Sequence, residues 1–301
     1  MRIHPYIFLT IAMLFFSGNF IVGKAFEGTI PPITLAFFRF ATGSLVLLPL
    51  CYKTLIKKLS LWRKEWKPLL SLSIFGIVLF NASLYLAVNY TSSINASIVD
   101  ALTPTVAAIL GFIVLKESLT KLQIVGIILS FAGILSIISN GSWHVITSLS
   151  FNIGDIIMLF GIICWASYSI IIKKHSYKFP PIAGLVVTMI IGTMILMPFA
   201  LIESYYVGFP NIFQQHILLG IAYIGIFPSA ISLLLWYRGV GEIGPAKASI
   251  FFNLVPVFTT IMAITILNEK MTYPQLFGGA IVLCGVYLST KSQKKFHQKA
   301  L

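Results

Sequence analysis

The chain has 301 residues, of which 58% are hydrophobic and only 10% are charged, whereas ordinary soluble domains carry about 25% charged residues. This composition excludes a soluble globular protein. The net charge of +13 would suit nucleic acid, but the basic residues flank apolar stretches in the way that sets membrane topology. We therefore expect a lipid bilayer as the charged partner and no nucleic acid.

Ten apolar stretches are long enough for membrane-spanning helices, each of which needs roughly 20 residues. In chain order they cover residues 5–24, 32–52, 68–88, 94–115, 122–139, 153–173, 182–202, 217–237, 246–267 and 275–290. The connections are too short to hold a separate soluble domain. The sequence predicts an all-α integral membrane fold with ten transmembrane helices.

The lysines and arginines orient this bundle. With a cytoplasmic N-terminus, the alternation of ten helices puts most of them inside: Arg2, Lys53, Lys57, Lys58, Arg63, Lys64, Lys67, Lys116, Lys121, Lys173, Lys174, Lys178, Arg238, Lys247, Lys291, Lys294, Lys295 and Lys299. Only Lys24 and Lys270 fall outside, and Arg39 lies within a helix. Because cytoplasmic loops are enriched in basic residues, we expect a plasma (inner) membrane protein with both termini in the cytoplasm.

The chain repeats itself. Residues 96–133 match residues 248–285 at a constant offset of 152, sharing Ala-Ser-Ile, Leu-x-Pro, Leu-x-Glu, Thr-x-x-Gln and two glycines seven residues apart. At an offset of 149, Lys24 matches Lys173 and Gly43 matches Gly192. The repeats are therefore residues 1–140 and 141–301, with five helices each. Since five is odd, the second repeat enters the membrane inverted, as in secondary transporters.

Several motifs resemble the EamA-like branch of the drug/metabolite transporter superfamily. They are Phe16-Ser17-Gly18-Asn19-Phe20 with Lys24, Pro32 and Arg39; Gly154-Asp155 followed by Cys164-Trp165-Ala166-x-Tyr168; and the segments 96–117 and 248–269. The resemblance covers essentially the whole chain. It implies a ten-helix carrier that moves a small metabolite by alternating access, with export as the preferred direction.

Other functional classes fit less well. All five histidines lie in loops or tails, and no HExxH or nucleophile-elbow motif is present, so we expect no enzyme. Three scattered cysteines suggest neither a zinc site nor a disulfide framework, and no cofactor or metal is expected. An importer, or a membrane scaffold or receptor without transport, stays open as an alternative.

Helices four and nine carry matching small or polar faces. Ser97, Asp100 and Pro104 recur at spacings of three and four in helix four. Helix nine repeats the pattern with Ser249, Asn253 and Pro256. Because a carboxylate facing lipid is costly, Asp100 and Asn253 are predicted to line a cavity. Pro104 and Pro256 each free a backbone carbonyl, and we interpret them as kinks or hinges.

Arg39 and Asp100 have no charged counterpart in the other repeat, where Thr188 and Phe252 stand instead. Both charges are expected roughly 10 Å deep in the membrane, from a rise of 1.5 Å per residue, so they could form a structural ion pair. In a functional interpretation, Asp100 exchanges its partner for a proton or a cationic substrate, or Arg39 holds a carboxylate. A cavity that contains both charges would suit an amino-acid-like zwitterion, with protons as the coupling ion.

Polar and aromatic residues supply the other cavity candidates. Asn81 and Tyr85 share a face of helix three, and Trp165 and Tyr168 lie in the centre of helix six, where an indole needs a partner. Asn19 is a similar mid-membrane group in helix one. On helix eight, the residues sharing a face are Ser229, Ser232 and Trp236.

Glycine pairs mark helices five and ten. Gly126 and Gly133, and likewise Gly278 and Gly285, form smooth stripes that favour close helix packing. The stripes could support the bundle itself or a homodimer through helices five and ten. Glu269, which precedes the Thr272-to-Gln275 capping box, is interpreted as structural.

Overall fold

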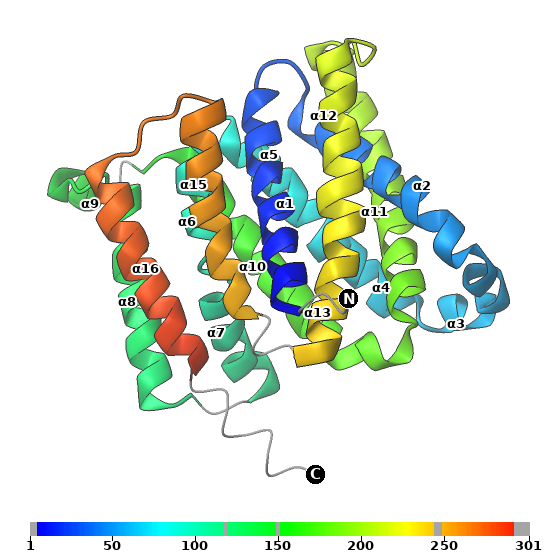
Figure 1. Cartoon of the computed structure of the whole chain (residues 1–301), viewed down its shortest axis with the longest axis horizontal. Coiled ribbons are helices and arrows are strands. Elements are labelled where there is room, and N and C mark those ends of the chain that lie inside the picture. The colour runs from blue at the N-terminus through cyan, green and yellow to red at the C-terminus, as the bar shows by residue number, and fades with distance from the viewer. Residues whose placement is uncertain (1–4, 117–118, 149–150, 244–248, 292–301) are drawn as a thin grey trace.

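The computed structural model describes residues 5–116, 119–148, 151–243 and 249–291. Within these ranges every regular element is a helix, and the long helices cross the molecule side by side from one end to the other (Figure 1). Figure 1 also shows α1 beginning and α16 ending toward the same, lower end of this bundle.

The elements follow the predicted apolar stretches in order. Up to residue 140 they are α1 (Pro5–Ala25), α2 (Pro32–Lys57), α3 (Leu59–Lys64), α4 (Trp66–Leu72), η1 (Ser73–Leu79), α5 (Phe80–Val88), α6 (Ser93–Asp100), α7 (Thr103–Leu115) and α8 (Lys121–Ile138). After residue 140 they are α9 (Trp143–Ser148), α10 (Ile153–His175), η2 (Ser176–Lys178), α11 (Pro181–Val207), α12 (Gln215–Ile226), η3 (Phe227–Ile231), α13 (Ser232–Ile243), η4 (Ser249–Asn253), α15 (Leu254–Ile266) and α16 (Tyr273–Lys291).

Eight of the described helical stretches are long and apolar enough to cross a membrane. Two further apolar helices, Phe251–Ile266 and Tyr273–Ser289, are shorter. The all-helical membrane class predicted from the sequence is therefore confirmed, but ten full spans are not. The predicted ninth span includes residues 246–248, which lie outside the described part of the chain.

The third and eighth predicted helices are interrupted at corresponding places. η1 and η3 are π-helical segments inserted between α-helices, and Phe75 to Leu79 in the first corresponds to Phe227 to Ile231 in the second at the offset of 152. A π turn closes its hydrogen bond one residue later than an α turn, and such turns are frequent at functional sites. Neither interruption is predicted from the sequence.

The fourth and ninth predicted helices are also broken. α6 ends at Asp100 and α7 begins at Thr103, with Pro104 as its second residue. In the ninth helix the short 3-10 segment η4 precedes α15, in which Pro256 is the third residue. A proline is tolerated in the first turn of a helix because its missing N–H has no partner there. Each proline thus starts a new helix after a break.

The glycine stripes of α8 and α16 face each other within the chain. A Cβ atom at Gly126 would lie 2.5 Å from Ser289 N, and one at Gly133 would lie 2.7 Å from Gly278 O. A Cβ atom at Gly285 would lie 2.5 Å from Ser130 N. The intramolecular interpretation of the stripes is therefore correct. These glycines are covered by the other helix of the same chain, so a homodimer through helices five and ten would have to use other residues of the two helices.

The outward surfaces of these two helices are apolar. Ile128 on α8 and Phe277 on α16 are each 63% exposed. Exposed apolar area of this kind is unfavourable in water but compatible with lipid chains.

Close packing also fixes the position of α2. This helix packs against α11 and α12, and a Cβ atom at Gly225 of α12 would lie 2.5 Å from Thr42 of α2. A Cβ atom at Gly43 would lie 3.0 Å from the Ser229 Cβ in η3. The centre of α2 is therefore held directly against the second π-helical segment.

Candidate functional site

The centre of the bundle contains a buried arginine. Arg39 lies in α2 and is only 6% exposed. Its Nε donates to Ser229 Oγ at 2.9 Å, and its Nη1 donates to Asn81 Oδ1 at 2.6 Å. Both acceptors are fully buried. The guanidinium thus joins α2 to α5 and to η3.

The π-helical segments orient both acceptors. Asn81 follows η1, and its Nδ2 donates back to Gly76 O at 2.9 Å and Ile77 O at 3.0 Å. These bonds turn Oδ1 toward Arg39. In η3, Ser229 Oγ donates to Ile224 O, five residues earlier, at 2.9 Å. The widened turns therefore allow each side chain to donate to a backbone carbonyl of its own helix and still accept a hydrogen bond from the arginine.

A tyrosine extends the cluster toward α1. Tyr85 is fully buried, and its hydroxyl donates to Asn19 Oδ1 at 2.5 Å. The charge of Arg39 also acts on this hydroxyl. We call Asn19, Arg39, Asn81, Tyr85 and Ser229 the central cluster. Four of its members are cavity candidates predicted from the sequence, and the fifth, Ser229, is predicted only to share a face of helix eight with Ser232 and Trp236.

The positive charge of Arg39 has no carboxylate partner within the described part of the chain. Six acidic side chains are described, and each is engaged elsewhere: Glu27 with Lys24, Glu65 with Lys178, Asp100 with Thr103, Asp155 with Thr91, Glu203 with the start of α2, and Glu269 with the start of α6. A buried charge is normally paired because its desolvation is costly. The central cluster is therefore a cationic site surrounded by neutral acceptors.

Asp100 does not pair with Arg39. Its Oδ1 accepts from Thr103 Oγ1 at 3.4 Å across the break between α6 and α7, and the residue is half-buried. The structural ion pair considered from the sequence is therefore wrong. Depth along two helices does not fix which faces they turn toward each other, and here α2 turns Arg39 toward α5 and η3.

The other candidates of helices four and nine are distributed along the two breaks. Ser97 is buried, and its hydroxyl donates within α6 to Ile94 O at 2.9 Å. Asn253 precedes α15, and its Oδ1 is a buried acceptor without a hydrogen-bond partner. The backbone of Ser249 begins η4, and its side chain lies outside the described part. Pro104 and Pro256 stand beside the breaks, as described above.

Trp165 and Tyr168 form an aromatic layer rather than part of the central cluster. The Trp165 ring lies 4.7 Å from the Phe80 ring and 4.9 Å from the Tyr168 ring. The Tyr168 ring packs on Gly76 of η1, where a Cβ atom would lie 2.3 Å from it. Through this layer α10 packs against η1 and α5, the elements that position Asn81. The two aromatic residues therefore contact the helices that carry the cluster.

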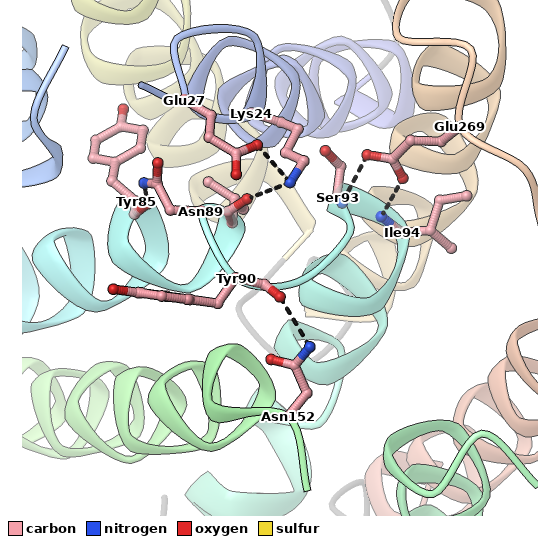
Figure 2. A network of polar contacts seen from close by, with 10 residues as sticks. Lys24, Glu27, Tyr85, Asn89, Tyr90, Ser93, Ile94, Asn152 and Glu269 are labelled. Carbon is pink, nitrogen blue, oxygen red and sulfur yellow. Dashed lines mark hydrogen bonds and ion pairs between the residues drawn. The ribbon is translucent and has the colours of Figure 1, made fainter. Parts of the chain in front are cut away.

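A second polar network closes the bundle at the end where α1 stops and α6 starts (Figure 2). Lys24 Nζ bridges Glu27 Oε2 at 2.7 Å and Val88 O at 2.9 Å. Asn152 reaches from the start of α10 to Tyr90 O. Glu269 accepts from the backbone nitrogens of Ser93 and Ile94 at the first turn of α6.

Four residues of this network line a cavity of about 470 Å³: Lys24, Tyr90, Asn152 and Glu269. Among the other residues that line it, Gln275 donates to Asn95 Oδ1 at 2.8 Å, and Asp155 accepts from Thr91 at 2.7 Å. Because a carboxylate at a helix N-terminus is favourable, the structure gives Glu269 a capping role. At the other end, Lys178 donates to Glu65 at 2.8 Å, and this hydrogen bond raises the pKa of Lys178.

Among the residues that the structure describes, no group of three His, Cys, Asp or Glu side chains could hold a metal ion. Arg39 and its neutral neighbours can instead bind an anion through charge-assisted hydrogen bonds.

Comparison with known proteins identifies the family. The sequence model of the EamA-like transporter family matches residues 4–139 and again residues 152–291. The chain belongs to the EamA-like transporter family. An "Uncharacterized transporter YyaM" from Bacillus subtilis is 34% identical over 285 residues, covering 95% of this chain and 93% of the relative.

Further relatives of this EamA-like protein extend across kingdoms. An "Uncharacterized transporter" from Archaeoglobus fulgidus is 30% identical and covers 97% of this chain and 99% of its own. A "WAT1-related protein" from Arabidopsis thaliana is 24% identical, over 92% and 82% of the two chains. A solved crystal structure matches with a TM-score of 0.62 at 16% identity, over 97% of this chain and 98% of the other, which shows a shared fold. The protein is a multi-pass membrane transporter for a small molecule.

Proposed function

We propose that this EamA-like protein is a secondary transporter that exports a small polar, amino-acid-like metabolite across the plasma membrane. Its ten helices form two inverted five-helix repeats, residues 1–140 and 141–301, which rock in opposition so that a central site opens alternately to each side. Protons are the coupling ion, and both termini lie in the cytoplasm.

The helix contacts support the two-repeat architecture. α1 packs on α13 and α15, and the corresponding α10 packs on α5 and α7. α2 packs on α12, and the corresponding α11 packs on η1. The corresponding helices α2 and α11 contact each other, as do α8 and α16. Exchange of the two repeats therefore maps these contacts onto one another, and the family model matches each repeat separately.

The central cluster is the observation that carries the proposal. Arg39 belongs to the first repeat, and its acceptor Ser229 belongs to the second. A rocking motion of one repeat against the other would change this contact inside the bundle. Charged groups inside a membrane bundle mark substrate and ion pathways by default, and binding sites of inverted-repeat carriers lie near the midplane at the repeat interface.

Transport is tested with the purified full-length chain in liposomes. We expect saturable flux of at least one compound from a panel of labelled amino acids, hydroxy acids and amines. The flux should be faster when an imposed pH gradient drives protons in the direction opposite to the substrate. Protein-free liposomes measure leakage. Reconstituted protein that is folded but gives no saturable flux of any panel compound would favour a scaffold or receptor.

The direction of transport needs a separate measurement. Cells that express the chain are preloaded with the transported compound, and its loss to the medium is compared with uptake from the medium. We expect the chain to accelerate loss more than uptake at the pH gradient of growing cells. Faster net uptake would make the protein an importer.

A further inference from the structure

We propose that Arg39 recognises a single carboxylate of the substrate, and that this carboxylate displaces Ser229 from the guanidinium. The inference rests on the proposed transport function and adds to it the class of ligand, a monoanionic carboxylate, and the contact that is exchanged.

The charge balance of the central cluster points to an anion. Arg39 is buried, and its Nε and Nη1 donate to a hydroxyl and an amide oxygen. Both acceptors are neutral, and so is the Tyr85 hydroxyl on which the arginine also acts. An arginine keeps its charge under all physiological conditions. Burial of this cation costs desolvation free energy that no counter-ion offsets. An anion therefore gains more binding free energy here than beside a cation that is already paired.

The number of charges selects the class of anion. The central cluster contains one cation, Arg39. Lys24, which follows Asn19 on α1, cannot supply a second positive charge because it is already paired with Glu27. A phosphate with two negative charges would leave one charge buried and uncompensated. A carboxylate carries one charge and presents two oxygens to the planar guanidinium, which has five N–H donors. The site therefore fits a monocarboxylate.

Ser229 is the contact that the substrate can replace. Its hydroxyl donates to Ile224 O and accepts from Arg39 Nε. It therefore keeps the hydrogen bond to Ile224 when a carboxylate takes its place beside Arg39. Asn81 lies in the same repeat as Arg39 and is fixed by two bonds to its own backbone. Replacement of Ser229 by a carboxylate therefore breaks this one hydrogen bond between the repeats and leaves the bond from Arg39 to Asn81 within the first repeat intact.

The structure offers a different role for Arg39, which is a permanent tie between helices. Under that role, ligands with and without a carboxylate would act alike on the folded protein. The two roles therefore separate in a binding measurement that compares isosteric ligands, and this measurement needs no transport.

The test uses the purified full-length protein in detergent and matched pairs of carboxylates and their carboxamides: alanine with alaninamide, serine with serinamide, phenylalanine with phenylalaninamide, and lactate with lactamide. A ligand that binds only the folded state raises the thermal midpoint. We expect at least one carboxylate to raise it in a saturable manner, with an apparent Kd at least about tenfold lower than that of its amide.

Three variants assign this effect. Arg39→Gln is expected to remove the preference for the carboxylate, and Arg39→Lys to keep part of it, because lysine supplies charge without the planar fork. Ser229→Ala is expected to strengthen carboxylate binding several-fold, because the competing acceptor is gone. Arg63→Gln, at an exposed arginine of α3, is the matched control and should bind as the unmodified protein does.

The outcomes distinguish the inference from the function on which it rests. A carboxylate preference that disappears in Arg39→Gln supports the inference even if liposomes show no flux, in which case the transport proposal fails alone. If no pair shows a carboxylate preference, the inference is overturned whatever the flux. If Arg39→Gln does not fold, weaker or unchanged carboxylate binding by Ser229→Ala overturns the proposed exchange.

Discussion

The side chain of Asp100 has an unusual position for a carboxylate in a membrane bundle. It lies at the end of α6, half-buried, with Thr103 as the partner across the helix break. No lysine or arginine of the described residues lies within ion-pair distance of it. A carboxylate that is neither paired nor held by several donors is well suited to take up and release a proton.

The variant Asp100→Asn tests proton coupling. Its amide oxygen can still accept from Thr103, but the side chain no longer binds a proton. One pH unit supplies about 1.4 kcal/mol, which corresponds to about tenfold accumulation for one proton per substrate. We expect the variant to lose this accumulation in liposomes while exchange of labelled for unlabelled substrate persists. Thr103→Val keeps the carboxylate and should keep the accumulation.

An Asp100→Asn protein that accumulates substrate like the unmodified chain at every pH would remove Asp100 from coupling. Loss of exchange together with accumulation, in a folded protein, would instead place Asp100 in substrate binding. Both results would leave the assignment of Arg39 unaffected, since the two side chains do not contact each other.

Among the helical elements, the pairing of α8 with α16 depends on backbone contact. Gly278 and Gly279 are neighbours in α16 but differ in surroundings. A Cβ atom at Gly278 would lie 2.6 Å from Ile137 Cγ1 and 2.9 Å from Gly133 O. A Cβ atom at Gly279 would meet only the Ile98 side chain, at 3.4 Å, which is ordinary contact.

This difference gives a matched pair of variants. Both changes to alanine gain about 1 kcal/mol of intrinsic helix preference. Gly278→Ala must also push the two backbones apart, and overpacking of this kind costs about 1–3 kcal/mol. We expect a lower thermal midpoint in detergent for Gly278→Ala and an equal or higher one for Gly279→Ala. Equal midpoints would contradict the close packing of α8 on α16.

At the same scale, the sequence predicts the helices better than their interruptions. The apolar stretch 5–24 corresponds to α1 (Pro5–Ala25), and 122–139 corresponds to α8 (Lys121–Ile138). Hydrophobic length defines both helices, and Thr120 caps the start of α8 in a capping box with Gln123. The π turns η1 and η3 leave no comparable signal. Both are mainly apolar, with Ser73 in η1 and Pro228 and Ser229 in η3, and they share no common motif. The extra residue in a turn depends instead on packing such as that of Tyr168 on Gly76.

The central cluster shows a similar limit. Burial of Arg39, Asn81, Tyr85 and Asn19 could be predicted, since polar groups in apolar helices turn inward. The partner of Arg39 could not. Repeat symmetry relates Arg39 to Thr188 and points to no partner, and Ser229 reaches the arginine only because α2 packs against η3.

For the whole molecule, the proposed inversion makes opposite predictions for corresponding connections. The connection after α1 and the connection after α10 match in sequence at an offset of 149, from Lys24 with Lys173 to Pro31 with Pro180. Thr29 in the first is exposed, and Tyr177 in the second is 81% exposed. If the repeats are inverted, these two positions lie on opposite sides of the membrane.

Single cysteines at these positions measure the sides directly. Cys284 is exposed and is first replaced by serine, whereas Cys51 and Cys164 are buried. We expect Thr29→Cys to react with a membrane-impermeant maleimide in intact cells, and Tyr177→Cys to react only after permeabilisation, because basic connections stay in the cytoplasm. Labelling of both from the same side would contradict inversion. The reverse pattern would keep the inversion and place both termini outside, so that the basic residues would no longer explain the orientation.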